Sequence, residues 1–103
     1  MESFRKVIKT TSKSQIIEMN IPFLGRMGKE NIKESQIITL ISGDGYLYSN
    51  NELTILKNND PVYLNKNTIT DILNTNDDKP LKVIIEYLPP KYHPRLEQTI
   101  EEK

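Results

Sequence analysis

The stretch SQIITLIS-GDG-YLYS, residues 35–49, decides the fold class that the sequence predicts. Residues 35–42 are rich in β-branched side chains, which pack well on a pleated strand. Gly43-Asp44-Gly45 is a strong turn signal, and residues 45–49 run back as a second apolar segment. This pattern predicts a β-hairpin.

On both sides of the hairpin the chain continues as short apolar segments separated by turn residues. Helical periodicity is weak before residue 94, so we expect an all-β domain in which antiparallel strands close into a jelly-roll barrel. Residues 1–94 would form the barrel, and the charged residues 95–103 would form a short helix or a disordered tail. The expected strands cover residues 4–10, 15–21, 35–42, 45–49, 52–56, 62–64, 68–73 and 81–88.

Composition excludes several classes of function. The 103 residues make one domain, and 14 basic side chains balance 14 acidic ones, so no basic patch for nucleic acid is visible. The chain has no cysteine, which excludes disulfides and thiolate metal sites. It shows no signal peptide and no apolar run that spans a membrane, so we expect a soluble cytoplasmic protein. Frequent Ile and Asn hint at AT-rich coding, as in a low-GC bacterium, a phage or a large virus.

Four segments carry a resemblance to a known family. Gly43-Asp44-Gly45 matches the turn that closes the first motif of the cupins. Residues 56–64 (LKNNDPVYL) resemble the strand that follows, and residues 67–76 (NTITDILNTN) resemble the second motif, with its asparagine at Asn74. Residues 80–94 (PLKVIIEYLPPKYHP) look like the closing segment of small single-domain cupins. The resemblance covers about nine-tenths of the chain and implies a single cupin barrel.

The residues that hold a metal in cupins are missing here. The family places two His and a Glu or Gln from the first motif, with one His from the second, inside the barrel mouth. The matching positions here are Asn31, Lys33, Gln36 and Thr70. Amides and hydroxyls are poor ligands for first-row metals, and Lys33 would repel a cation. The chain's single histidine, His93, falls in the closing segment, so we expect neither metal nor cofactor.

The resemblance then leaves a polar barrel mouth. A lining of amides, hydroxyls and one lysine suits a polar or anionic small ligand, such as a sugar phosphate or a nucleotide. Tyrosines on the strands would stack on that ligand. The competing interpretation is that these side chains only fill the barrel interior. The candidate ligand-binding residues are Asn31, Lys33, Gln36, Thr70, Asn74, Tyr48 and Tyr87.

Two other functions stay open. A metal-independent sugar epimerase or isomerase would use Lys33 with Tyr48 or Tyr87 for acid–base catalysis. An interaction protein would act as a homodimer, in which the first strand, with Phe4, Val7 and Ile8, extends a partner's sheet. If the source is viral or a phage, such a protein would bind a host factor or sequester a host ligand.

Overall fold

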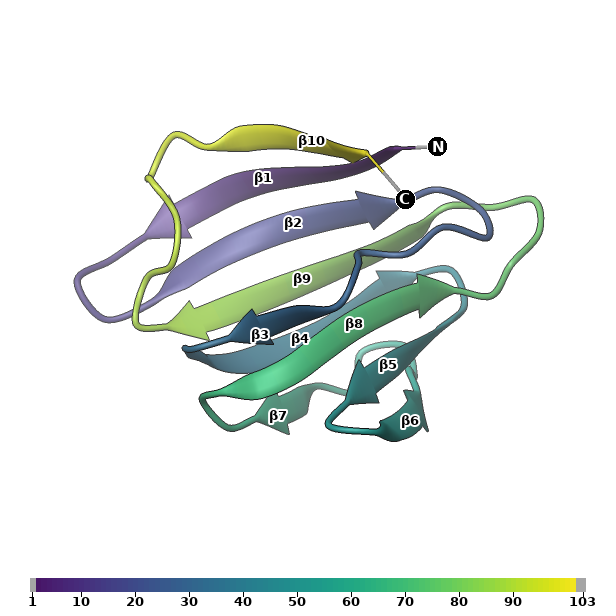
Figure 1. The fold of residues 1–103 in the computed structure, drawn as a ribbon. Helices are drawn as coiled ribbons and strands as arrows, with labels where there is room; N and C mark the ends of the chain where they lie inside the picture. The colour runs from purple at the N-terminus through teal and green to yellow at the C-terminus, as the bar shows by residue number, and fades with distance from the viewer. Residues whose placement is uncertain (1, 102–103) are drawn as a thin grey trace.

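The computed structural model describes residues 2–101 and places them in ten strands and no helix (Figure 1). The segments predicted as strands are confirmed, with ends that differ by at most two residues. The strands are β1 (Glu2–Thr10), β2 (Gln15–Ile21), β3 (Glu30–Ile32), β4 (Ser35–Ser42), β5 (Gly45–Ser49), β6 (Glu52–Ile55), β7 (Val62–Leu64), β8 (Thr68–Asn74), β9 (Leu81–Leu88) and β10 (Glu97–Glu101).

The strands form two antiparallel sheets that face each other (Figure 1). The larger sheet has the order β10-β1-β2-β9-β4-β7, and the smaller has the order β3-β8-β5-β6. Neighbours in a sheet are often far apart in the sequence, as where β9 lies between β2 and β4. This is the jelly-roll arrangement that the sequence predicts.

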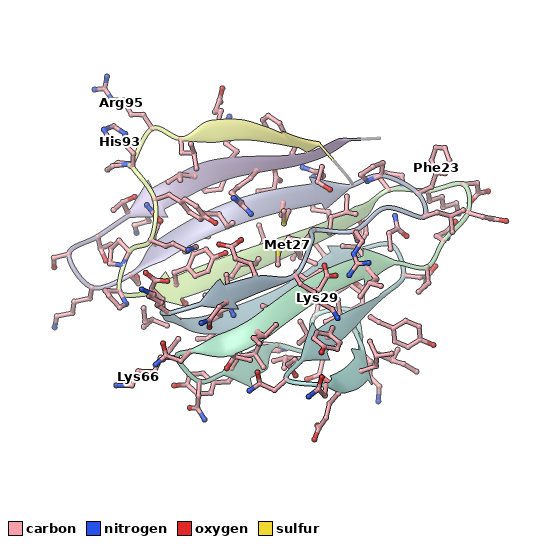
Figure 2. All side chains as sticks on the ribbon, in the orientation of Figure 1. Phe23, Met27, Lys29, Lys66, His93 and Arg95 are labelled. Atoms are coloured by element: carbon pink, nitrogen blue, oxygen red, sulfur yellow. The ribbon has the colours of Figure 1, made fainter. Side chains whose placement is uncertain are left out.

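Apolar side chains fill the space between the sheets. On β2, Ile17, Met19 and Ile21 all point inward and are completely buried, and β9 alternates in the same way. Burying a side chain of this size stabilises the fold by roughly 1.5–3 kcal/mol. Met27 lies between the two sheets as well (Figure 2). The core is therefore one continuous cluster inside the barrel.

The C-terminal segment differs from its prediction. Residues 97–101 form β10, which pairs with β1 at the edge of the larger sheet, rather than a helix or a disordered tail. Residues 102–103 lie outside the described residues. Because β10 covers one edge of β1 and β2 covers the other, β1 offers no free edge for a partner's strand. Val7 is buried in the core, and strand exchange through Phe4, Val7 and Ile8 stays a prediction that would require β1 to leave its present neighbours.

The loop over residues 22–29 runs along the edge of β8, in line with β3, and is held there by backbone hydrogen bonds and by one buried carboxylate. Asp71 has no exposed surface, and its Oδ2 accepts hydrogen bonds from the guanidinium of Arg26. Its Oδ1 accepts the backbone N–H of Gly28 at 2.8 Å and that of Ile72 at 2.8 Å. Asp71 thus ties this loop to the sheet.

In the part of the chain that the structure describes, no helix is long and apolar enough to span a membrane.

Candidate functional site at the barrel mouth

We call the barrel mouth the end of the barrel where β4 and β8 begin and β9 ends. Three of the predicted site residues meet there: Gln36, Thr70 and Tyr87, each at most 1% exposed. The Gln36 side chain donates a hydrogen bond from Nε2 to Oγ1 of Thr70 at 2.9 Å, which joins the two sheets. Tyr87 lies opposite Gln36 in the β4–β9 register and points to the same side.

The segment after β9 adds an aromatic ring and a cation to this end. Tyr92 packs against Tyr87 edge to face, with 5.7 Å between ring centroids. The guanidinium carbon of Arg5, on β1, lies 4.8 Å from the Tyr92 ring centroid, which is within the range of a cation–π contact. Arg5 is only 6% exposed, so a cationic side chain is buried beside two tyrosines.

Acidic and basic side chains balance around this cluster. Glu30 of β3 lies 3.9 Å from Arg5 and 3.2 Å from Nζ of Lys91. Lys91 also lies 3.9 Å from Glu34, in the connection between β3 and β4. Two cations therefore face two carboxylates, and the mouth carries both signs of charge close together.

One buried amide holds the C-terminal segment across the mouth. Gln15 accepts hydrogen bonds at Oε1 from the backbone N–H groups of Lys91 and Tyr92, at 3.1 and 2.8 Å. Its Nε2 donates to the carbonyl of Tyr92 at 2.7 Å and to Oγ1 of Thr10 at 3.0 Å. Gln15 has no exposed surface, so this anchor is shielded from water. Tyr92 is thereby held in one position over the mouth.

Burial sets the protonation of the two tyrosines. Burial, and next the neighbouring Tyr92, raise the pKa of Tyr87 well above its usual range. Burial also raises the pKa of Tyr92, although Arg5 partly opposes this rise. Both hydroxyls are therefore neutral donors at neutral pH. Within residues 2–101, the buried hydroxyl of Tyr92 and Oε1 of Glu34 have no hydrogen-bond partner.

Four of the seven predicted site residues lie elsewhere. Asn31 and Lys33 are exposed, because the inward-facing positions of β3 are Glu30 and Ile32. The prediction chose the wrong parity of this short strand, and a shift of one residue moves every side chain to the other face. The prediction that Lys33 lies inside the barrel is therefore wrong. The predicted acid–base pair of Lys33 with Tyr48 or Tyr87 is wrong for the same reason.

Tyr48 and Asn74 are also outside the mouth. Tyr48 lies on the outer face of the smaller sheet, where its hydroxyl donates to Oδ1 of Asn51 at 2.7 Å and Nζ of Lys29 lies 4.6 Å from its ring. Asn74 is buried at the far end of β8, about 13 Å beyond Thr70 at the usual rise of a strand. Its Nδ2 is within 3.0 Å of three backbone carbonyls and its Oδ1 accepts from Asn76, so it anchors a loop.

The residues that give the mouth its charge were not predicted from the sequence. Arg5 alternates along β1 with exposed residues, as the buried Ser3 and Val7 do, so all three side chains point to the same face of the strand. This alternation is the sequence signal that places Arg5 inside the barrel. Glu30 shares its parity with Ile32 in the same way. Lys91 and Tyr92 follow Pro90 in a segment without periodicity, and only the fold brings them over the barrel. His93 is exposed and points outward with Arg95 (Figure 2).

The residues at the mouth do not fit the transition metal that the resemblance to the cupins implies. The oxygen donors are two carboxylates, one amide and the hydroxyls of threonine and tyrosine, and both carboxylates, Glu30 and Glu34, already face the cations of Arg5 and Lys91. Transition metals of the first row favour imidazole, which none of these positions supplies. Among residues 2–101, no three His, Cys, Asp or Glu side chains are placed to hold an ion together.

Comparisons with known proteins find the fold among solved structures alone. No family model and no curated protein matches the chain. A protein from Bacillus halodurans is 19% identical and superimposes with a TM-score of 0.84, over 90% of this chain and 75% of that one. An RmlC-like cupin with a double-stranded β-helix fold from Methanocaldococcus jannaschii is 23% identical, with a TM-score of 0.73 over 82% and 78% of the two chains. KdgF from Halomonas is 16% identical, with a TM-score of 0.77 over 86% and 80%.

The topology and these similarities define the class of protein. The chain has the cupin fold, a double-stranded β-helix in a single domain, as the resemblance in its sequence implies.

Proposed function

We propose that this protein is a metal-free cupin-type module that binds a polar or anionic small ligand at the barrel mouth. The observation that carries the proposal is the buried hydroxyl of Tyr92, for which residues 2–101 supply no hydrogen-bond partner, on a ring that stacks against the guanidinium of Arg5. Buried polar groups nearly always have a hydrogen-bond partner, so such a group is a ready donor to a bound acceptor. A phosphate or carboxylate oxygen supplies that acceptor.

The neighbouring side chains support the same class of ligand. Arg5 recognises planar or tetrahedral oxyanions through a fork of N–H donors, and Lys91 adds a point charge. Gln36, Thr70 and Tyr87 contribute amide, hydroxyl and phenol groups behind the cations. The carboxylates of Glu30 and Glu34 compete for the cations, so the site favours a ligand with both hydroxyls and an anionic group.

Thermal unfolding of the purified protein with glucose 6-phosphate, adenosine monophosphate and inorganic phosphate tests the proposal. At about 100 times Kd a ligand adds about 2.7 kcal/mol, which raises Tm by roughly 10–15 °C in a domain of this size. Tyr92→Phe keeps the ring and removes the hydroxyl, and we expect affinity to fall about tenfold. Tyr48→Phe, the matched control outside the mouth, should bind as the parent does. The proposal fails if no probe raises Tm.

A second candidate function is association with a second copy of the chain. The edge strand β6 has only β5 as a neighbour, and all four of its residues are exposed. Leu53 and Ile55 are 63% and 61% exposed, and they lie opposite Tyr48 and Tyr46 on the outer face. A free edge beside an apolar stripe is a template for a second strand, and two β6 strands pair antiparallel about a two-fold axis.

Sedimentation equilibrium tests this dimer. Leu53→Lys places a charge in the apolar stripe and should shift the parent dimer to monomer. Ile8→Lys changes another exposed apolar residue, on β1, and is the matched control, which should stay dimeric. A monomeric parent protein at every concentration would exclude the homodimer.

A further inference from the structure

A groove of about 350 Å³ lies beside the barrel mouth, where the end of β7 and the start of β8 approach the turn between β5 and β6. The turn between β7 and β8 forms its remaining wall (Figure 1). None of the mouth residues Gln36, Thr70, Tyr87 and Tyr92 lines this groove. The groove is therefore distinct from the cluster of buried side chains at the mouth.

The lining of the groove is polar and carries no net charge. Three asparagines, Asn50, Asn65 and Asn67, contribute amides, and each amide group offers both a donor and an acceptor. One acid and one base, Glu52 and Lys66, balance each other. Lys66 extends away from the barrel at the β7–β8 turn (Figure 2), so no cation is concentrated inside the groove.

One aromatic ring completes the lining. Tyr63 is 59% exposed although it lies on a strand. An exposed tyrosine offers an apolar face with a polar tip, which suits a ligand that has both kinds of surface. The faces of sugar rings carry C–H groups, and their edges carry hydroxyls, so the ring and the amides match the two parts of one saccharide.

The two turns hold these groups in place before any ligand arrives. Asn50 and Asn67 adopt left-handed backbone conformations, with φ of 44° and 62°, which Asn tolerates better than most residues. Asn50 exchanges hydrogen bonds with Ile69 through its backbone N–H and its Oδ1, both at 3.0 Å. Thr68 donates to the carbonyl of Asn65 at 2.6 Å. Within the described chain, the side-chain amides of Asn65 and Asn67 form no hydrogen bond and are open to a ligand.

From these observations we infer that the groove binds a neutral polyhydroxylated ligand, a mono- or disaccharide, with Tyr63 as the stacking surface and the asparagines as hydrogen-bonding groups. The volume is near the lower end for small-molecule sites, which favours one or two sugar rings over a longer chain. The balanced charge favours a neutral saccharide over a phosphate. This inference is independent of the ligand proposed for the mouth.

Two-dimensional NMR of the isotope-labelled protein, titrated with glucose, galactose, mannose and maltose, tests the inference. We expect at least one of them to shift the amide signals of residues 49–52 and 63–68, with a Kd in the millimolar range that is ordinary for small neutral ligands. Tyr63→Ala should weaken binding about tenfold, as loss of a good aromatic contact does. Tyr63→Phe keeps the ring and should bind within about twofold of the parent, since the stacking surface is unchanged.

Tyr46→Ala is the matched control, because Tyr46 is an exposed tyrosine on a strand away from the groove. It should bind saccharides as the parent does. If no saccharide shifts residues 49–52 and 63–68, or if Tyr63→Ala binds as well as the parent, the inference is wrong. Leu64 and Ser49 of the groove pair with Gln36 and Thr70 of the mouth, so the two sites are distinguished by their variants and probes. Tyr63→Ala should leave anion binding at the mouth unchanged, and Tyr92→Phe should leave saccharide binding in the groove unchanged.

Discussion

Gly45 is the residue at which the hairpin meets the rest of the barrel most closely. A Cβ at this position would lie 2.6 Å from the carbonyl oxygen of Leu73 and would overlap the side chain of Leu81. Since a backbone carbonyl cannot move aside cheaply, we expect Gly45→Ala to lower the free energy of unfolding by about 2–3 kcal/mol. Chemical denaturation measures this loss.

Gly28→Ala is the control for backbone conformation alone. Gly28 has a φ of +98°, yet a Cβ there would meet nothing within 4 Å. Its substitution should cost about 1 kcal/mol, the usual penalty of a left-handed residue with a side chain. If both variants lose the same stability, the close contact at Gly45 does not decide the fold of this hairpin.

The buried tyrosines at the mouth predict a pH dependence of stability. Burial raises the pKa of Tyr87 well above the unfolded value of about 10, and also raises that of Tyr92. Above about pH 10 the unfolded chain loses these protons while the folded chain keeps them, so the folded state is disfavoured as pH rises. Their contribution is fully present below pH 10 and falls by up to about 1.4 kcal/mol per pH unit for each tyrosine.

Urea denaturation between pH 8 and 11 measures this slope, and Tyr87→Phe should make it shallower because the variant has one proton fewer to lose. Circular dichroism at neutral pH shows whether the variant keeps its fold. An unchanged slope in a folded Tyr87→Phe variant would contradict the assigned burial of this hydroxyl.

At the scale of elements, the loop over residues 22–29 depends on Asp71. Asp71→Ala removes the acceptor for Arg26 and for the N–H of Gly28. We expect the free energy of unfolding to fall by about 2–3 kcal/mol, which is less than for a fully buried ion pair because water reaches part of Arg26. Limited proteolysis should then cleave within this loop first. Glu18→Ala breaks the more exposed pair with Lys82 and should cost less than about 1 kcal/mol. Equal losses in the two variants would exclude the anchoring role.

The elements also show where prediction from sequence succeeds and fails. β4 and β9 are long and rich in β-branched residues, so their pattern fixes both their position and their inward faces. β3 has three residues, too few for alternation to define its parity, and the prediction placed Asn31 and Lys33 inside instead of Glu30 and Ile32.

β10 was missed because its strand character depends on its neighbour. Residues 97–101 alternate little and are mostly charged or polar, and they form a strand only by pairing with β1. The same holds for Lys91 and Tyr92, which reach the mouth because Gln15 binds their backbone from 76 and 77 residues away. Contacts of this range have no local signature in the sequence.

At the scale of the whole molecule, the barrel has the cupin fold and a polar cluster at its mouth. Elemental analysis of the purified protein should find less than about a tenth of an equivalent of iron, manganese, nickel or zinc, since the mouth supplies no imidazole. A chelator should leave Tm unchanged, because no binding energy of a metal adds to folding. Stoichiometric metal, or a lower Tm after chelation, would contradict this interpretation.

We propose that the barrel mouth binds a polar or anionic ligand without metal, and NMR of the metal-free protein is the most direct measurement of that binding. Titration with glucose 6-phosphate and with adenosine monophosphate should shift signals of Gln36, Thr70, Tyr87 and Tyr92, which the fold brings together. Signals of Asn74 and of β6 should stay in place. If neither ligand moves the signals of the mouth, or if they move only after metal is added, the claim is wrong.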